Sequence, residues 1–271
     1  MTKEYRTVLT IAGSDGSGGA GIQADIKTCT ALQCYALSVI TAVTAQNTAG
    51  VDSVCLLEEK CITAQFRAIS RDIRIDAVKI GMLGSPAIIK AVALLLRELG
   101  GNVPVILDTV LGSSSGSRLL DPAAIPLLKE ELFALATLIT PNIPETALLT
   151  GKEEEPEGRE AIEAAAAELL ETGAGAVLIK GGHAKGEECR ECLLHDGRYF
   201  WFSAPKIRTI NTHGTGCTLS SAIAAFMARG ESIVTAVEKA KAYTHSALQA
   251  GADYRLGCGN GPLLHTYRLW Q

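Results

Sequence analysis

Short apolar runs rich in β-branched residues alternate with helical patterns along most of the 271 residues. Such alternation is typical of an α/β fold with a mainly parallel central sheet and helices on both faces. It predicts strands at residues 7–12, 37–44, 51–56, 77–80, 103–108, 138–140 and 176–180, and helices at 22–32, 60–71, 87–99, 160–171, 219–228 and 233–249. A hydrophobic content of 47% favours one large domain, residues 1–271, over two small ones.

Charge and hydropathy exclude several classes of protein. The net charge is −4 and the sequence has no Lys/Arg-rich tract, so a general affinity for nucleic acid or anionic membrane is not expected. No apolar run reaches the roughly 18 residues of a membrane span. Residues 1–6 lead into a strand rather than into a signal-peptide core. We therefore expect a cytoplasmic protein.

Eight cysteines are spaced unlike those of a small disulfide scaffold, so reduced thiols are expected. Cys189 and Cys192, with His195 nearby, resemble part of a zinc site. A structural zinc site needs four ligands, and no second pair is visible. The alternative is a β-hairpin of residues 191–194 and 198–202 around Asp196-Gly197, a strong hairpin signal. The missing ligands favour the hairpin.

Polar residues follow the predicted strands at the points where these end. Gly13, Asp108, Asn142 and Lys180 each stand at the end of a different apolar run. In open parallel sheets, ligands bind beyond the carboxyl ends of the strands. The sequence therefore places a binding site at this edge of the sheet.

A glycine-rich turn containing Gly214 and Gly216 runs directly into a small-residue apolar helix. The turn brings backbone N–H groups close to a ligand, and the helix start adds unpaired N–H groups and a positive dipole end. Together they suit an anion such as a transferring phosphate. Cys217 stands at the mouth of this pocket, and a helix N-terminus can lower the pKa of a cysteine. The alternative is that this turn only connects two elements and binds no ligand.

A second glycine-rich loop, residues 13–21, follows a strand and opens a helix. It fits the G-x-G-x-x-G dinucleotide pattern, but residues 39–44, where that pattern needs an acid, hold none. Close wrapping of a small polar substrate is the better interpretation. Gln46 follows the next strand, and its amide offers one acceptor and two donors to an aminopyrimidine edge. An exposed loop amide is an equally good interpretation of Gln46 from this segment alone.

Asn142 and Glu145 stand three residues apart at a helix start. They could form a capping box, or they could support a hydrated Mg²⁺ beside phosphates, because Mg²⁺ keeps many of its waters. The sequence permits both. Asp108 could join the same ion, and Lys180 could neutralise phosphate charge.

These segments together resemble the ribokinase-like superfamily and, more closely, the bacterial hydroxymethylpyrimidine/phosphomethylpyrimidine kinases of thiamine synthesis. The resemblance runs from Thr7 to about His265. It is carried by ordered motifs at residues 12–15, 18–25, 45–48, 79–82, 108–110, 140–145, 180–183 and 211–218.

The resemblance implies ATP-dependent phosphorylation of 4-amino-5-hydroxymethyl-2-methylpyrimidine and then of its monophosphate. Gln46 would hydrogen-bond the pyrimidine, and the residues shaping its pocket would be Gly13, Ala20, Thr44, Met82 and Val110. Asn142, Asp108 and Glu145 would organise Mg²⁺ and ATP, the last two at the metal. Lys180 and Lys241 would meet nucleotide phosphates, and Thr215 would also bind the nucleotide. Gly214 and Gly216 would stabilise the transferring group, with Cys217 where most ribokinase-like enzymes carry an Asp base.

Two departures from the family pattern stand out. The loop at residues 111–120, a candidate lid, lacks the basic residue and the acid that relatives often have around its Ser-Gly, and Thr44 replaces a common Val. A pyridoxal kinase of the same branch and a non-catalytic pyrimidine- or vitamer-binding protein are the alternatives. The resemblance also implies a homodimer.

Overall fold

In a computed structural model that describes residues 3–112, 119–182 and 186–270, all the named strands join one nine-stranded sheet. Its order is β3-β2-β1-β4-β5-β6-β7-β8-β9. The strands are β1 (Thr7–Asp15), β2 (Tyr35–Gln46), β3 (Val51–Leu56), β4 (Ala77–Ile80), β5 (Val105–Leu107), β6 (Leu138–Ile139), β7 (Val177–Lys180), β8 (Glu188–His195) and β9 (Arg198–Pro205). The six strands from β2 to β7 in this order are parallel, whereas β3, β8 and β9 pair antiparallel at the edges.

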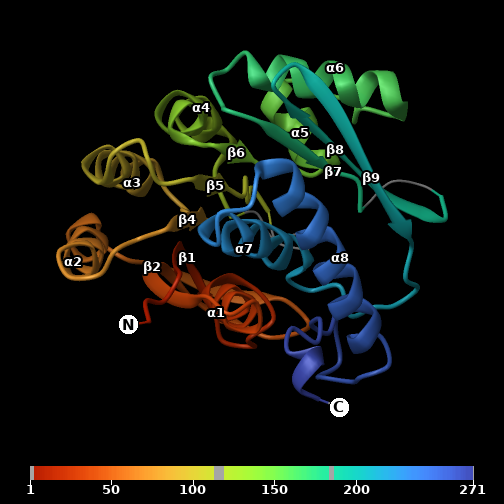
Figure 1. The fold of residues 1–271 in the computed structure, drawn as a ribbon, viewed down its shortest axis with the longest axis horizontal. Coiled ribbons are helices and arrows are strands. Elements are labelled where there is room, and N and C mark those ends of the chain that lie inside the picture. Colours follow the sequence, from red (N-terminus) through yellow and green to blue (C-terminus); the bar gives the residue numbers. More distant parts are fainter. Residues whose placement is uncertain (1–2, 113–118, 183–185, 271) are drawn as a thin grey trace.

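Helices cover both faces, as the alternation predicts (Figure 1). One face carries α1 (Gly21–Ala31), α7 (Thr215–Ala228) and α8 (Ile233–Gly251). The other carries α2 (Glu59–Ser70), α3 (Pro86–Leu99), α4 (Ile125–Leu132), α5 (Ile143–Thr150) and α6 (Gly158–Leu170). Three short 3₁₀ turns lie at Pro122–Ala124, Phe133–Leu135 and Tyr267–Leu269.

Period-two alternation along the strands divides the core between the two faces. Val8 belongs to the core under α1, α7 and α8, while its neighbour Leu9 belongs to the core under α2–α6. Ile106 and Leu107 divide in the same way. The central strands are therefore apolar on both sides, which explains why they read as continuous apolar runs.

The structure confirms the predicted hairpin and argues against zinc. Glu188–His195 and Arg198–Pro205 pair around Asp196 and Gly197, which have positive φ of 48° and 68°. Cys189 and Cys192 are three residues apart on one strand, so their side chains point to opposite faces. Cys192 is fully buried and Cys189 contacts Glu191. Within the described residues no group of three or more His, Cys, Asp or Glu side chains has the arrangement of a metal site.

Helix α4 is the main element that the sequence pattern did not predict. Pro126 occupies its first turn and Pro122 opens the 3₁₀ turn before it. Proline fits the first turn of a helix because its missing N–H has no partner there, but along a sequence it resembles a break. Across the residues that the structure describes, no helix is both long enough and apolar enough to cross a membrane.

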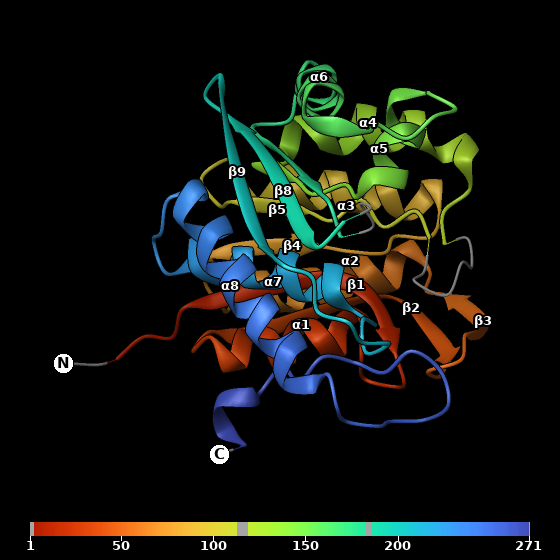
Figure 2. The same cartoon turned by 90° about the vertical axis from the view of Figure 1, so that its right-hand side faces the viewer.

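The carboxyl ends of the parallel strands lie on one side of the molecule, where α7 also begins (Figure 2). Asp108 and Lys180 lie at or just after these ends, and Gly13 lies two residues before the end of β1. An isolated parallel bridge joins Asn142 to Lys180 and brings the α5 start to the same edge. The predicted clustering of polar strand ends is thus confirmed.

Candidate active site

The two glycine-rich loops pack directly against each other. Gly214 has a φ of 80°, and a Cβ there would overlap the carbonyl oxygen of Gly19. His213 Nε2 lies 2.8 Å from Asp15 Oδ2, and both side chains are buried. Residues almost two hundred positions apart thus form one continuous wall.

Asp15 organises the first loop from its centre. Its Oδ1 accepts from the backbone and hydroxyl of Ser17, at 2.9 and 2.8 Å, and its Oδ2 accepts from Gly19 N and Ala20 N, at 3.2 and 2.8 Å. Burial on its own would raise the pKa of Asp15, but the hydrogen bonds from His213, Ser17 and Ala20 lower it to about 2. A charged carboxylate therefore holds the loop at neutral pH.

Gln46 lies where the two loops meet. Its Nε2 is 3.3 Å from His213 Nε2, and its Oε1 is 3.2 Å from the hydroxyl of Thr44, which also lies 2.7 Å from Ser14 O. Of the two interpretations of Gln46, an exposed loop amide does not fit this half-buried position.

Other residues expected around the substrate lie next to these loops. A Cβ on Gly13 would lie 3.2 Å from Met82 Sδ, so the loop backbone rests on that side chain. Ala20 is fixed through its N–H by Asp15. Val110 follows Asp108 and lines a small space with Gly81, Leu83, Leu107 and Leu120. Residues 113–118 of the candidate lid lie outside the described residues.

The first turn of α7 presents unpaired backbone donors. Gly214 is its N-cap and, as a glycine, has no side chain to cap the helix. The Thr215 hydroxyl donates to Thr212 O at 2.7 Å. The N–H groups of Gly216 and Cys217 make no hydrogen bond within the described part of the chain. These free N–H groups are the donors that the predicted anion pocket requires.

The expected lowering of the Cys217 pKa is wrong for this structure. Burial raises the pKa of the partly exposed Cys217 to about 11, although the nearby Lys79 ammonium opposes the shift. Cys217 is therefore a neutral thiol at physiological pH, and the helix dipole does not turn it into a ready base.

An acid and a lysine lie beside this turn. Lys180 Nζ donates to Asp108 Oδ1 at 2.6 Å, and Ser220 on α7 donates to Asp108 Oδ2 at 3.1 Å. A Cβ on Gly216 would lie 3.4 Å from Lys180 Nζ, so the ammonium lies against the anion pocket. Lys180 thus lies beside the unpaired N–H groups at the start of α7.

Asn142 and Glu145 form a complete capping box at the start of α5. Asn142 Oδ1 accepts from Glu145 N, and Glu145 Oε2 accepts from Asn142 N, both at 2.8 Å. Thr109 adds a hydrogen bond at 3.3 Å to the same Oε2. Among the described residues Oε1 has no hydrogen-bonding partner. Burial first, with a contribution from the Asp108 charge, raises the pKa of Glu145 to about 7, even though Lys180 opposes the shift.

Lys241 contacts a different part of the molecule. It is buried on α8, forms an ion pair with Glu191 on β8 and donates to Cys189 O at 3.0 Å. These contacts tie α8 to β8. The expected phosphate contact of Lys241 therefore rests on the resemblance alone.

Sequence reasoning missed a fully buried ion pair below the loops. Lys79 on β4 and Asp25 on α1 are both 0% exposed, and Lys79 Nζ lies 2.9 Å from each carboxylate oxygen of Asp25. Thr10 and Ser221 donate to the same carboxylate, each at 2.5 Å. The sequence feature that could have revealed this pair is Lys79, a lysine inside the predicted apolar strand 77–80.

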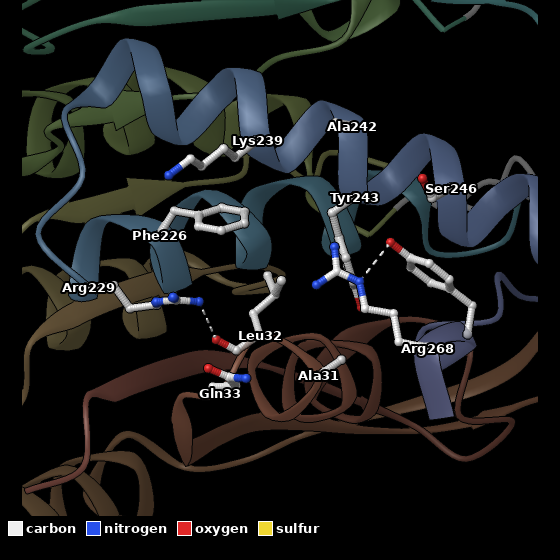
Figure 3. Close-up of a pocket in the computed structure, with 11 residues that line it drawn as sticks. Ala31, Leu32, Gln33, Phe226, Arg229, Lys239, Ala242, Tyr243, Ser246 and Arg268 are labelled. Carbon is white, nitrogen blue, oxygen red and sulfur yellow. Dashed lines mark hydrogen bonds between the residues drawn. The ribbon is translucent and has the colours of Figure 1, made fainter. Parts of the chain in front are cut away.

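A separate cavity of about 420 Å³ lies at the opposite end of α7 (Figure 3). It is lined by cationic side chains from α7, α8 and the C-terminal turn, namely Arg229, Lys239 and Arg268. Arg229 donates to Leu32 O at 3.0 Å, and Arg268 donates to Tyr267 at 3.2 Å. The cavity is remote from the first turn of α7 and contributes nothing to the site there.

The fold and the anion pocket define a ribokinase-like small-molecule kinase. Residues 15–264 match the family model described as phosphomethylpyrimidine kinase. The chain is 47% identical over 264 residues to the hydroxymethylpyrimidine/phosphomethylpyrimidine kinase of Rhizobium meliloti, covering 97% of this chain and 98% of that protein. It is 45% identical over 262 residues to the protein of the same name from Escherichia coli, with the same coverage.

Solved structures agree with this assignment. The Bacillus subtilis pyridoxal kinase, solved as an ADP complex, superposes with a TM-score of 0.89 at 32% identity, covering 99% of this chain and all of that one. The Clostridium difficile phosphomethylpyrimidine kinase superposes with a TM-score of 0.78 at 42% identity, covering 89% of this chain and 99% of that one. The chain belongs to the phosphomethylpyrimidine kinase family.

Proposed function

We propose that this protein uses ATP to phosphorylate 4-amino-5-hydroxymethyl-2-methylpyrimidine and then its monophosphate, in thiamine biosynthesis. The observation that carries the proposal is the uncapped first turn of α7, with Lys180 on one side and the Gln46–His213 contact on the other. Free N–H donors suit the transferring phosphoryl group, and an amide suits the edge of an aminopyrimidine. Family membership supports both assignments.

The chemistry requires the substrate hydroxyl oxygen to bond to the γ-phosphorus while the bond to the β–γ bridging oxygen breaks. The transition state of such a transfer is loose, so positioning and charge stabilisation matter more than a strong base. The hydroxyl proton leaves late, to the thiolate form of Cys217 that is in equilibrium with the neutral thiol, so a raised Cys217 pKa is compatible with this requirement. The N–H groups of Gly216 and Cys217 would receive the charge on the transferring oxygens.

Mg²⁺ fits the acidic residues on the nucleotide side. Asp108 and Glu145 are linked through Thr109, and burial leaves Glu145 with a raised pKa that a nearby cation would offset. We propose that these acids hold hydrated Mg²⁺ with help from Asn142. The bound ion would neutralise phosphate charge.

Phosphorylation of pyridoxal is the second candidate. The Staphylococcus aureus pyridoxal kinase, solved in complex with pyridoxal, superposes with a TM-score of 0.88 at 29% identity. Both substrates are flat heteroaromatic rings bearing a hydroxymethyl group, so the anion pocket does not separate them. The higher identity to the pyrimidine kinases, 42–47% for several relatives, favours the pyrimidine.

A coupled assay of ADP release decides between these candidates. We expect Mg²⁺-dependent ADP release with the hydroxymethylpyrimidine and with its monophosphate, at a higher kcat/KM than with pyridoxal. A preference for pyridoxal would replace the proposal by the second candidate. Tight binding of either ring without ADP release would indicate the non-catalytic binding protein.

Three further properties complete the proposal. We propose a single catalytic domain, a homodimer and a cytoplasmic location. The single sheet supports the first, and the family resemblance supports the other two. Light scattering after size exclusion would test the dimer. We expect a mass near 57 kDa, twice the 28.5 kDa of one chain, and a measured mass of 28.5 kDa would contradict the dimer.

A further inference from the structure

Two consecutive serines anchor the first turns of α7 to two different acid–lysine pairs. Ser220 donates to Asp108, which pairs with Lys180. Ser221 donates to Asp25, which pairs with Lys79. Residues four apart on a helix lie one above the other on the same face. Gly216 therefore lies in line with Ser220, and Cys217 lies in line with Ser221.

The two pairs differ in their access to solvent and ligands. The side chains of Lys180 and Asp108 are 11% and 2% exposed, and Lys180 lies against Gly216. The side chains of Lys79 and Asp25 are both 0% exposed. A Cβ on Gly81 would lie 2.9 Å from Lys79 Nζ, so the buried ammonium lies directly beneath the strand end that leads to Met82. Its third N–H has no hydrogen-bonding partner within the described chain.

Stability alone does not explain why the Lys79–Asp25 ion pair is buried. The desolvation cost of two buried charges commonly cancels their attraction, so apolar residues of equal volume would serve stability as well. Asp25 nevertheless connects four elements at one point, through Thr10 on β1, Lys79 on β4, Ser221 on α7 and its own helix α1. Helices α1 and α7 each begin at one of the two glycine loops.

We propose that Lys79 and Asp25 are positioning residues of the phosphoryl-transfer site. Asp25 fixes the start of α7 relative to α1 through Ser221, and the ammonium that it holds supplies a permanent positive charge beneath Cys217. The Lys79 charge then acts on the thiol and on the negative charge developing next to it, whereas Lys180 is left for the nucleotide. This role rests on the proposed kinase function.

The charged groups around Cys217 allow the proposal to be tested through the rate at which the Cys217 thiol is alkylated. Lys79 and Lys180 favour a thiolate there, and Asp25 and Asp108 disfavour it. Lys79→Met should slow the alkylation of Cys217 by iodoacetamide at pH 8, and Asp25→Asn should accelerate it. A merely structural pair would change both rates in the same direction by loosening the fold. Peptide-resolved mass spectrometry isolates Cys217 from the other cysteines, and no substrate is needed.

The activity test uses the double variant Lys79→Met/Asp25→Asn, which removes both charges. The Asn oxygen can accept from one of the Thr10 and Ser221 hydroxyls, and the other hydroxyl can turn to accept from the Asn NH2 group. We expect a melting temperature within a few degrees of the wild type, a kcat at least tenfold lower and a smaller change in KM. Lys79→Arg, which keeps the charge, should retain more activity than Lys79→Met. The exposed pair Arg67–Glu98 provides the control as Arg67→Met/Glu98→Gln, which should leave kcat and alkylation unchanged.

Wild-type kcat in a folded double variant would overturn the proposal. So would alkylation rates that change in the same direction in the two single variants. If the double variant does not fold, Lys79→Arg decides. Alkylation and kcat near those of the wild type are expected because the charge is kept, and a tenfold or larger loss of kcat in this folded variant would overturn the proposal. An inactive wild type would instead refute the kinase function, and the alkylation result would still stand.

Discussion

The imidazole of His213 lies 2.8 Å from the carboxylate of Asp15 and so joins the two glycine-rich loops of the site. The contact is reinforced by the backbone, because Gly214 lies against the carbonyl of Gly19 with no room for a side chain. A kinase that must hold a ring and a phosphate in line needs these loops in a fixed relative position. Asp15 supplies that rigidity and leaves the N–H groups of α7 available.

The first prediction concerns the pH dependence of stability. The pKa of Asp15 is about 2, below its ordinary value of 3.8, so its carboxylate contributes stability that is present above about pH 4 and lost as the pH falls through 2. Asp15→Asn should lower the free energy of unfolding at pH 7 by about 2 kcal/mol, and by clearly less at pH 3. Urea denaturation at both values measures this difference.

The exposed Asp52→Asn on β3 is the matched control and should show no such pH-dependent difference. An equal loss for Asp15→Asn at pH 7 and pH 3 would contradict the role of the charge. The loss of stability would then come from the changed hydrogen-bonding shape of the side chain and not from its charge.

The sequence predicts the sheet well because its central strands are buried on both faces and read as apolar runs. It also predicts that Gly13, Asp108 and Lys180 meet, since carboxyl ends of parallel strands share one edge. It does not predict the contacts between Asp15 and His213 or between Asp25 and Lys79. These partners are 198 and 54 residues apart, and no local pattern encodes which charges meet. Lys241 shows the same limit, since its partner Glu191 lies on β8, 50 residues away along the sequence.

The second prediction concerns the substrate side. Gln46→Ala should raise the KM for the hydroxymethylpyrimidine roughly 2- to 12-fold, because one hydrogen bond contributes about 0.5–1.5 kcal/mol net. The KM for ATP should change little. Steady-state kinetics of the variant and of Gln249→Ala, an exposed amide on α8, make the comparison. An unchanged KM and kcat for the pyrimidine would remove Gln46 from the site.

The third prediction separates the metal role of Glu145 from its capping role. Gln at this position can still complete a capping box, so Glu145→Gln should keep the helix start. The pKa of Glu145 is raised to about 7, so its ionisation costs stability as the pH rises from about 4.5 through 7. The variant should therefore melt at a higher temperature than the wild type at pH 8, and this advantage should vanish near pH 4.

The catalytic activity of Glu145→Gln should fall, whereas its melting temperature at pH 8 rises. We expect Glu145→Gln to lower kcat and to raise the Mg²⁺ concentration needed for half-maximal activity, because a negative charge near the ion is lost. Titrations of activity with Mg²⁺ provide the measurement. Full activity together with a lower melting temperature would show that Glu145 serves the capping box alone.

The last prediction concerns Cys217. Cys217→Ala should lose most activity, on the order of 100-fold, if the thiolate form of Cys217, a minor species at neutral pH, accepts the departing proton. Cys217→Asp should retain part of the activity, because a carboxylate can accept that proton. The exposed Cys258→Ala should behave as the wild type. Near-normal kcat in Cys217→Ala would transfer the rate enhancement to the backbone N–H groups of α7 and to the metal.

Chemical modification tests the protonation state of the same residue. Because burial raises the pKa of Cys217 to about 11, its alkylation should be slow at pH 7 and should accelerate steadily towards pH 10. Alkylation should inactivate the enzyme, and bound pyrimidine should protect it if the ring covers the thiol. Fast alkylation that is already complete at pH 7 would mean that the α7 dipole outweighs desolvation. Cys217 would then be a thiolate able to act as a base from the start of the reaction.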